Sequence, residues 1–495
     1  MMMKLNLGII VLMSLWLTAC SDFLEESSQD EVRPTLVTDI EQLLIGEAYW
    51  SSQECLYNIT DIFTDDMGTV LPLNSITEPI ISQKYYQYSW RTDMFAESGG
   101  GFDDNFWSLH YKKIAGCNVV LDYLDKVSGD EDLREHIRGE ALVLRAYYYL
   151  QLVNLFGLPY NYGDPKENLG VPLKLSMDIT AELFVRESVA KVYELIEHDL
   201  LEGNRLLEES TKEYNFNRIN HLAAKAFLSR MYLYMERWDD ALRYAEEVLN
   251  VQSDLLSFSS FSDISFEVMF YSSGVYAVDT PEEIIFGRPY YTPSVNFYTE
   301  TTFVPSDELI DLYEYYPKDP VCMGDLRGRF SFYRQRDMRG VLYVSGFFKG
   351  SMVKSSPNRC GGIRVAEMYL NRAEVNIHKF MDSGDDEYRV KALSDLNLLR
   401  EHRWDTRKVA YSPKEITDAG KLFEFYKSER RRELCGEDNH RWFDLRRFGM
   451  PELKHVYLRT QSEKEEFSLS QGSSLYVLPI PEEIIRVNPK LKQNP

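Results

Sequence analysis

The stretch richest in charged and aromatic side chains lies near the C-terminus, between Glu429 and Gly449. Their sequence, ERRRELCGEDNHRWFDLRRFG, alternates arginines, acids and aromatic rings. Such a run could bind an anion or hold catalytic groups. Guanidinium forks also pair with several carboxylates at once and tie helix ends to loops. We favour the second interpretation and expect this run to be architectural.

The sequence contains none of the short motifs that mark common catalytic or nucleotide-binding sites. No G-x-G-x-x-G, G-x-x-x-x-G-K-[ST], G-x-S-x-G or H-E-x-x-H pattern occurs. No two of the eight histidines stand at metal-ligand spacing on one helix, so no metal site is predicted. With 78 acidic residues, two carboxylates at glycosidase spacing stay open as a minor alternative. The sequence therefore does not predict an enzyme.

The composition is that of a globular, acidic protein rich in aromatic side chains. The chain has 495 residues, of which 44% are hydrophobic and 27% charged, which excludes a disordered or fibrous protein. Its net charge of −23 repels phosphate backbones and argues against nucleic-acid binding. The 33 Tyr, 26 Phe and 7 Trp must serve both the core and some exposed use.

The first nineteen residues read as a cleaved lipoprotein signal peptide. Lys4 is followed by the apolar run Leu7 to Leu17, which is too short to span a membrane. The sequence Leu17-Thr18-Ala19-Cys20 is similar to the bacterial lipobox, so Cys20 is expected to be lipidated and to become the N-terminus. Residues 20–34 then form an acidic and polar tether, which resembles an export signal toward the cell exterior.

Helical periodicity predicts an all-α scaffold. Apolar residues recur at helical spacing over 104–124, 132–156, 188–207, 363–380, 387–402 and 421–435. The helical pairs fall at about 103–250 and 362–448. The segments at about 60–102 and 251–355 read instead as loops and short strands, and loops on a rigid scaffold commonly carry binding sites.

One helical pair, within 220–250, matches the pattern of a tetratricopeptide repeat. Ser229, Tyr232, Ala241, Ala245 and Val248 follow the small and aromatic positions of that repeat. Ala245 departs from the pattern, which prefers a larger residue there. A single repeat cannot bury its apolar face, so further helical pairs must stack against it.

Six segments, in order along the chain, resemble the SusD/RagB family of outer-membrane lipoproteins. They are the lipobox, GEALVLRAYYYLQLVNLFG (139–157), LAAKAFLSRMYLYMERWDDAL (222–242), IRVAEMYLNRAEVN (363–376), the arginine-rich run and YVLPIPEEIIRVNPKLKQNP (476–495). The link from Cys435 to His440 is longer than the family usually has. The resemblance implies one SusD-like domain over 35–495, in which tetratricopeptide-like helix pairs form a superhelical scaffold with a loop-rich ligand-binding face and a few short strands.

The resemblance also implies a function and a partner. Members capture oligosaccharides at the cell surface and deliver them to a SusC-like TonB-dependent transporter in the outer membrane, without catalysis. Some branches capture oligopeptides, and this alternative stays open, as do a lipid-anchored glycoside hydrolase and a purely structural scaffold. No cofactor is implied, and the sequence leaves a structural Ca²⁺ open.

Sugar sites combine flat aromatic rings with a few polar partners. The first candidates lie in the aromatic run 85–91 and in the loop before it: Tyr86, Tyr88, Trp90, Arg91 and Asp66. A β-strand that buries the three aromatic rings on one face is an equal alternative, and an acid at a turn also serves as a cap. The second candidates lie in the turn-rich stretch 290–298: Tyr290, Tyr291, Asn296 and Tyr298.

Overall fold

The computed structural model describes residues 34–50, 60–69, 85–95, 105–177, 183–260, 282–289, 303–314, 324–330, 332–336, 342–347, 360–407, 409–459 and 463–494. Cys20 and the predicted ligand residues Tyr290, Tyr291, Asn296 and Tyr298 lie outside these ranges. Among the helices built from the described residues, none has the length and apolar character needed to cross a membrane.

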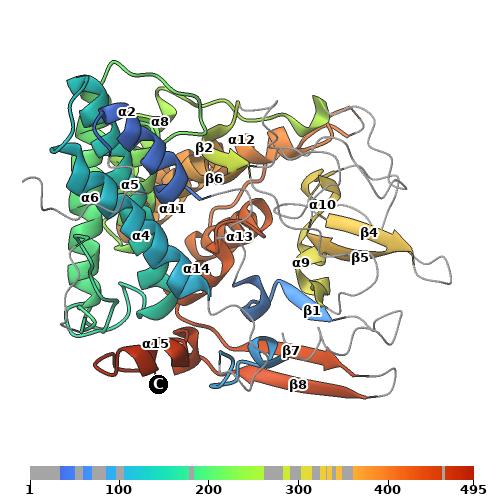
Figure 1. Cartoon of the computed structure of the whole chain (residues 1–495). Helices are drawn as coiled ribbons and strands as arrows, with labels where there is room; N and C mark the ends of the chain where they lie inside the picture. The colour runs from blue at the N-terminus through green and yellow to red at the C-terminus, as the bar shows by residue number, and fades with distance from the viewer. Residues whose placement is uncertain are drawn as a thin grey trace, which may run out of the picture.

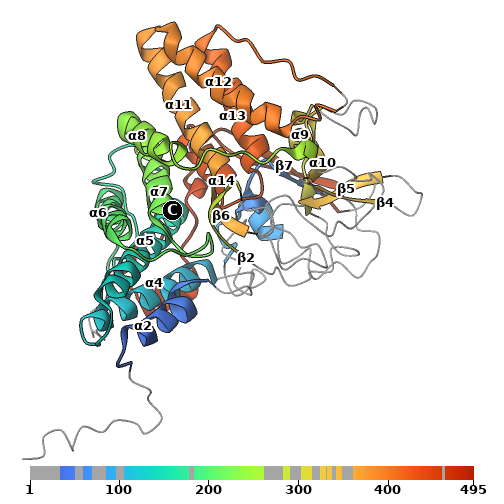
Figure 2. The same cartoon turned by 90° about the horizontal axis from the view of Figure 1, so that it is seen from above.

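Most of the long helices lie on one side of the molecule, and those that are neighbours in sequence pack side by side (Figures 1 and 2). The longer helices are α4 (Asn105–Leu124), α5 (Glu131–Phe156), α6 (Val189–Glu209), α7 (His221–Tyr234), α8 (Trp238–Leu249), α11 (Val365–Ser383), α12 (Asp386–Arg403) and α13 (Ala419–Leu434). The shorter ones are α2 (Val37–Leu43), the π-helix η1 (Leu44–Ala48), α9 (Asp307–Leu312), α10 (Arg327–Phe330), α14 (His440–Arg447), α15 (Glu482–Val487) and the 3₁₀ turns η2 (Asp61–Phe63), η5 (Phe258–Ser260) and η6 (Ser474–Tyr476).

Side-chain caps fix where the long helices begin. Asp130 precedes α5 and accepts a hydrogen bond from the backbone N–H of Leu133 at 2.8 Å. Ser188 does the same for Lys191 at the start of α6, at 3.2 Å. Each cap of this kind stabilises a helix by about 1 kcal/mol, because it satisfies an amide that has no partner within the helix.

The C-terminal end of α5 is held by two buried arginines. Arg186 donates to the carbonyl of Phe156 at 2.7 Å, and Arg446 donates to the carbonyl of Gly157. Cations at this end of a helix are favourable because its carbonyls carry partial negative charge. Asn494 also donates to Phe156, at 3.0 Å, so the end of the chain is anchored to the helical scaffold.

The pair α7 and α8 has the packing of a tetratricopeptide repeat. The hydroxyl of Ser229 donates to the carbonyl of Ala241 at 3.0 Å, so the two helices touch closely at these small residues. Tyr232 stacks on Tyr244 with 5.8 Å between ring centroids, and Ala245 is fully buried. Ala245 thus occupies a buried position at which the repeat pattern prefers a larger residue.

Glycines allow α5 and α6 to approach each other equally closely. A Cβ atom on Gly139 would lie 3.1 Å from the carbonyl oxygen of Gly203 and 2.8 Å from Leu207. A Cβ atom on Gly203 would lie 2.6 Å from Val143. Small residues at facing positions therefore recur in a second helical pair.

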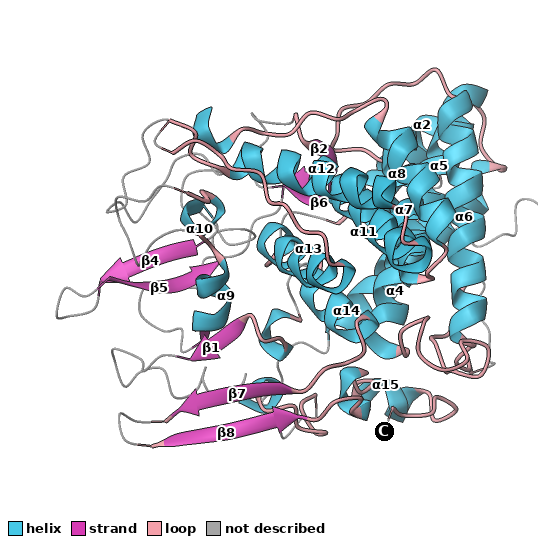
Figure 3. Ribbon diagram, turned by 180° about the vertical axis from the view of Figure 1, so that it is seen from behind, coloured by secondary structure: helices cyan, strands magenta, loops and turns pink. Residues whose placement is uncertain are grey.

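Within the described ranges the strands form four short antiparallel ladders, and all except the ladder of 284–289 with 360–364 lie away from the long helices (Figure 3). They pair β1 (Met67–Thr69) with β3 (Phe303–Pro305), β2 (Ile284–Pro289) with β6 (Cys360–Arg364), β4 (Phe332–Arg336) with β5 (Leu342–Phe347), and β7 (Leu453–Leu458) with β8 (Lys464–Leu469). The hydroxyl of Thr69 donates to the carbonyl of Val456 at 2.7 Å, which joins β1 to β7. The predicted fold, an all-α scaffold of tetratricopeptide-like pairs with a few short strands, is confirmed.

Candidate functional site

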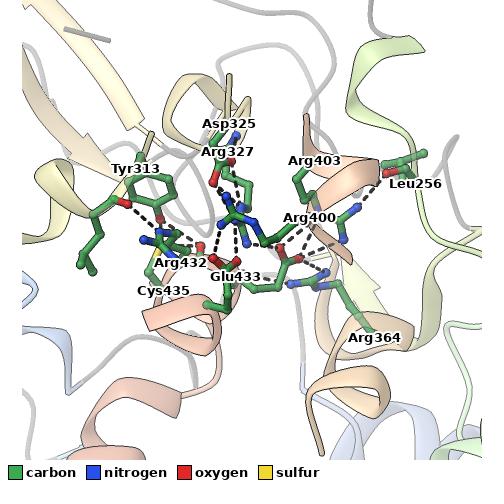
Figure 4. Close-up of polar contacts among 12 residues, drawn as sticks. Leu256, Tyr313, Asp325, Arg327, Arg364, Arg400, Arg403, Arg432, Glu433 and Cys435 are labelled. Atoms are coloured by element: carbon green, nitrogen blue, oxygen red, sulfur yellow. Dashed lines mark hydrogen bonds and ion pairs between the residues drawn. The ribbon is translucent and has the colours of Figure 1, made fainter. Parts of the chain in front are cut away.

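The arginine-rich run of α13 forms a buried ion-pair network (Figure 4). At its centre, the Glu433 carboxylate accepts hydrogen bonds from Arg403 at 3.0 Å, Arg364 at 3.1 Å and Arg327 at 3.3 Å. These four side chains are at most 4% exposed. Buried charges persist only when they are paired, and here each one has partners. The network is therefore part of the interior and not a ligand surface.

The same network attaches three segments of the irregular middle of the chain to α12 and α13. Arg403 donates to the carbonyl of Leu256 at 2.7 Å and to the carboxylate of Glu283 at 2.8 Å. Arg327 pairs with Asp325 at 2.6 Å. The role of this run is thus architectural, as the sequence indicates.

Glu429 shows that a carboxyl buried in the network stays ionised. Burial alone would raise the pKa of this carboxyl, but the positive charges of Arg327, Arg432 and Arg400 outweigh burial and lower its pKa to about 2. Glu429 therefore stays ionised at physiological pH, and the ion pairs of the network persist there.

Asp66 lies in the interior, which corrects the expectation that it accepts sugar hydroxyls. Its carboxylate is fully buried and accepts a hydrogen bond from Arg431 of α13 at 2.6 Å. The neighbouring Asp65 accepts two hydrogen bonds from Arg441 of α14, at 2.6 and 2.8 Å. Both acids therefore fix the loop 60–69 to the helical scaffold.

Tyr88 and Trp90 are also buried, so the alternative of a buried aromatic face is the correct one for these two rings. Residues 85–88 form a helical turn and not the β-strand considered from sequence. Tyr88 is 1% exposed and Trp90 3%, and both rings stack on His455 of β7. The Trp90 indole donates to the carbonyl of Phe63 at 3.0 Å. These two side chains hold the turn in place.

Tyr86 and Arg91 lie on the outer side of the same turn. Tyr86 is half-buried and Arg91 is exposed, with its guanidinium 4.3 Å from the centroid of the tyrosine ring. Arg91 makes a forked pair with Asp93, both bonds measuring 2.8 Å. The hydrogen bonds from Arg91 lower the pKa of Asp93, so this acceptor remains ionised.

Two residues of the hairpin β7–β8 complete this surface. The hydroxyl of Tyr85 donates to Glu465 at 2.5 Å, and Arg459 donates to the same carboxylate at 2.5 Å. The rings of Tyr85 and Tyr86 meet edge to face, 6.0 Å apart. Figure 1 shows the blue turn that contains these tyrosines beside β7 and β8. Tyr85, Tyr86, Arg91, Arg459 and Glu465 are here named the tyrosine surface.

The tyrosine surface combines the types of group that sugar sites commonly contain. Aromatic rings can present apolar faces to C–H groups, guanidinium groups can donate to oxygens, and a carboxylate can accept from hydroxyls. Burial raises the pKa of Tyr85, so its phenol stays a neutral donor. Within the described ranges, no three His, Cys, Asp or Glu side chains are placed to hold a metal ion.

The candidates predicted from the sequence include Tyr86 and Arg91 but not Tyr85, nor the hairpin residues Arg459 and Glu465. These two residues are separated from Tyr85 by more than 370 positions, so no local pattern joins them. A signal that could have found them is the period-two pattern of the two strands, in which Leu453, His455 and Tyr457 alternate with exposed positions, as do Phe467 and Leu469, which is typical of a half-exposed hairpin.

Comparisons with known proteins agree with the fold. Residues 22–233 match a SusD-like family model described as "Starch-binding associating with outer membrane", and residues 339–495 match the model of the SusD family. No curated protein sequence matches the chain.

Several solved structures share the fold over nearly their whole length. A SusD-like carbohydrate binding protein from Bacteroides vulgatus is 21% identical, with a TM-score of 0.68 and coverage of 92% of this chain and 98% of that chain. A SusD superfamily protein from Bacteroides thetaiotaomicron is 22% identical, with a TM-score of 0.62 and coverage of 93% and 98%. One from Bacteroides fragilis is 20% identical, with a TM-score of 0.67 and coverage of 92% and 99%. With two SusD family models matched along its length, this chain belongs to the SusD/RagB family.

Proposed function

We propose that this protein binds neutral oligosaccharides at the bacterial cell surface and passes them on unchanged. The observation that carries the proposal is the tyrosine surface, where two tyrosine rings, two guanidinium groups and a carboxylate meet on one face. The family description, which names starch binding and the outer membrane, supports the same ligand class. A net charge of −23 disfavours polyanionic glycans.

The anchor and the partner belong to the same proposal. Cys20 carries the lipid, and the tether 20–34 joins it to the folded domain. Fifteen extended residues reach about 50 Å, which lets the domain sit over a SusC-like TonB-dependent transporter in the outer membrane. The lipid keeps the domain on the outer face of that membrane.

Binding is expected to be weak, reversible and non-catalytic. A few stacked rings and exposed hydrogen bonds, less the cost of ordering the ligand, give affinities of roughly micromolar to millimolar. Weak binding suffices because a tethered domain holds its ligand at a high local concentration near the transporter. No chemical step on the glycan is part of the proposal.

Isothermal titration of the soluble form beginning at Ser21 tests this function. The titrants are neutral oligosaccharides, acidic oligosaccharides and mixed oligopeptides, followed by chromatography of each mixture. The expected result is heat from one class of neutral glycan, recovered intact. Heat from peptides alone would assign the protein to the peptide-capturing branch, and shortened glycans would identify a hydrolase.

A further inference from the structure

A small pocket lies next to the tyrosine surface, where the turn 85–95 meets the C-terminal segment. Its volume is about 200 Å³. Figures 1 and 3 show α15, which contributes to its wall, close to the hairpin β7–β8. Its lining includes two carboxylates, a hydroxyl and apolar side chains: Asp93, Glu482, Thr92, Phe95, Pro479 and Ile480.

The wall of the pocket is fixed before any ligand arrives. The side-chain amide of Gln493 donates to the carbonyl of Ile480 at 2.6 Å and accepts from its N–H at 2.7 Å. Asn494 donates to the carbonyls of Phe156 and Leu478 at 3.0 and 2.7 Å. The Gln493 amide thus braces the C-terminal segment internally, and the Asn494 amide holds the segment against α5. A rigid wall lowers the ordering cost of binding.

The polar groups left for a ligand are two acids and a hydroxyl. Glu482 and Thr92 are exposed, and both line the pocket. Asp93 keeps 39% of its side chain exposed while its carboxylate pairs with Arg91. Carboxylates accept from adjacent hydroxyl groups and repel anions, so a neutral polyol fits and a uronate or sulfate does not.

The volume of the pocket limits how many sugar rings can enter it. Pockets that hold drug-sized molecules span about 300–1,000 Å³, so a pocket of about 200 Å³ holds a single ring. Phe95 is 6% exposed and supplies an apolar floor for the C–H face of that ring. The forked pair of Arg91 and Asp93 joins the pocket to Tyr86, because Arg91 lies over that tyrosine.

We propose that this pocket receives the terminal ring of a neutral oligosaccharide whose following rings lie on the tyrosine surface. This inference rests on the proposed function. It makes the protein selective for chain ends, because a pocket with room for about one ring favours a ring that carries a single glycosidic substituent. The Arg91–Asp93 pair then contacts the linkage between the terminal ring and the next one.

The test uses the soluble form beginning at Ser21 and neutral hexasaccharides of glucose, xylose and mannose. Each is titrated unmodified and in two blocked forms that carry a bulky group at one end or the other. One of the two blocked forms is expected to lose binding. If both blocked forms bind with the affinity of the unmodified glycan, the inference is overturned.

Substitutions in the pocket test whether its side chains contribute to glycan binding. Glu482→Ala and the pocket-filling Thr92→Phe are expected to weaken binding about tenfold, since each removes a polar contact or the space for the ring. Glu483→Ala changes the neighbouring exposed acid, which does not line the pocket, and should bind as wild type does. If Tyr86→Ala weakens binding while both pocket variants bind normally, the inference fails and the proposed function stands. If the wild type binds no glycan, both fail.

Discussion

His455 and Trp90 stack face to face, with 4.0 Å between their ring centroids and 21° between their planes. The two nitrogens of His455 lie 2.7 Å from the carbonyl oxygen of Tyr88 and 2.9 Å from that of Thr64. One buried imidazole therefore connects β7, the loop 60–69 and the turn 85–95. The position of the tyrosine surface depends on this connection.

Replacement of Trp90 by alanine is expected to destabilise the protein by about 3–5 kcal/mol, because it removes a buried ring from the core. Trp90→Phe keeps the stacking on His455 and loses mainly the hydrogen bond to Phe63, so its cost should be smaller. Denaturant unfolding measures both values. Unchanged stability in Trp90→Ala, together with lost glycan binding, would instead make Trp90 a ligand platform.

The stability contributed by His455 should depend on pH. Burial lowers the pKa of His455, although the two carbonyl contacts and the charge of Asp65 act in the opposite direction. The unfolded chain, whose histidines titrate near about 6.5, therefore takes up this proton more readily than the folded protein does. The contribution is complete above about pH 6.5 and declines as the pH falls below that value.

The measurement that follows compares Tm at about pH 7 and about pH 5 in the wild type and in His455→Gln. The decrease in Tm on acidification should be smaller in the variant, which has no proton to gain at this position. Equal decreases would show that His455 has the same pKa in the folded and unfolded states.

The central carboxylate of the buried network should be essential for stability. Glu433→Gln leaves Arg403, Arg364 and Arg327 without a shared negative partner, and loss of a buried partner costs about 3–5 kcal/mol. The matched control is Glu424→Gln on the same helix. Its side chain is 71% exposed, and its pair with Lys427 contributes less than about 1 kcal/mol. Equal unfolding free energies in the two variants would contradict the assigned role of the network.

The close approach of α5 and α6 predicts that Gly139→Ala destabilises the protein. The added methyl group would lie 2.8 Å from Leu207 and 3.1 Å from the carbonyl of Gly203, so the helices must separate at a cost of about 1–3 kcal/mol. Gly46→Ala is the control, because a Cβ atom there meets nothing within 4 Å. Thermal unfolding should rank the two variants in that order, and the reverse ranking would contradict the packing described.

Much of the helical scaffold follows from local sequence, because amphipathic periodicity and caps act over a few residues. The periodicity predicts helices over 132–156 and 421–435, and the structure has α5 at Glu131–Phe156 and α13 at Ala419–Leu434. The helix predicted from 363 begins later, at Val365. The preceding residues pair with β2 across about eighty positions, and this pairing overrides their helical tendency.

The candidate site is less predictable because it depends on partners far along the chain. Tyr86, Tyr88 and Trp90 are similar in type and spacing, and the two buried rings differ from the half-exposed one by contacts with distant residues, above all with His455. The sequence around Asp66 is typical of an exposed acid in a loop, but its carboxylate is buried and paired with Arg431. Local patterns do not contain such contacts.

The most direct test of the account is glycan titration of Tyr86→Ala and Arg91→Ala beside Tyr162→Ala. Tyr162 is 44% exposed on the loop after α5 and serves as the control for loss of a surface tyrosine. The account predicts that the first two variants bind the glycan identified for the wild type roughly five- to tenfold more weakly, with unchanged Tm, and that Tyr162→Ala binds as the wild type does. Wild-type affinity in both Tyr86→Ala and Arg91→Ala would contradict the assignment of the tyrosine surface as the binding site.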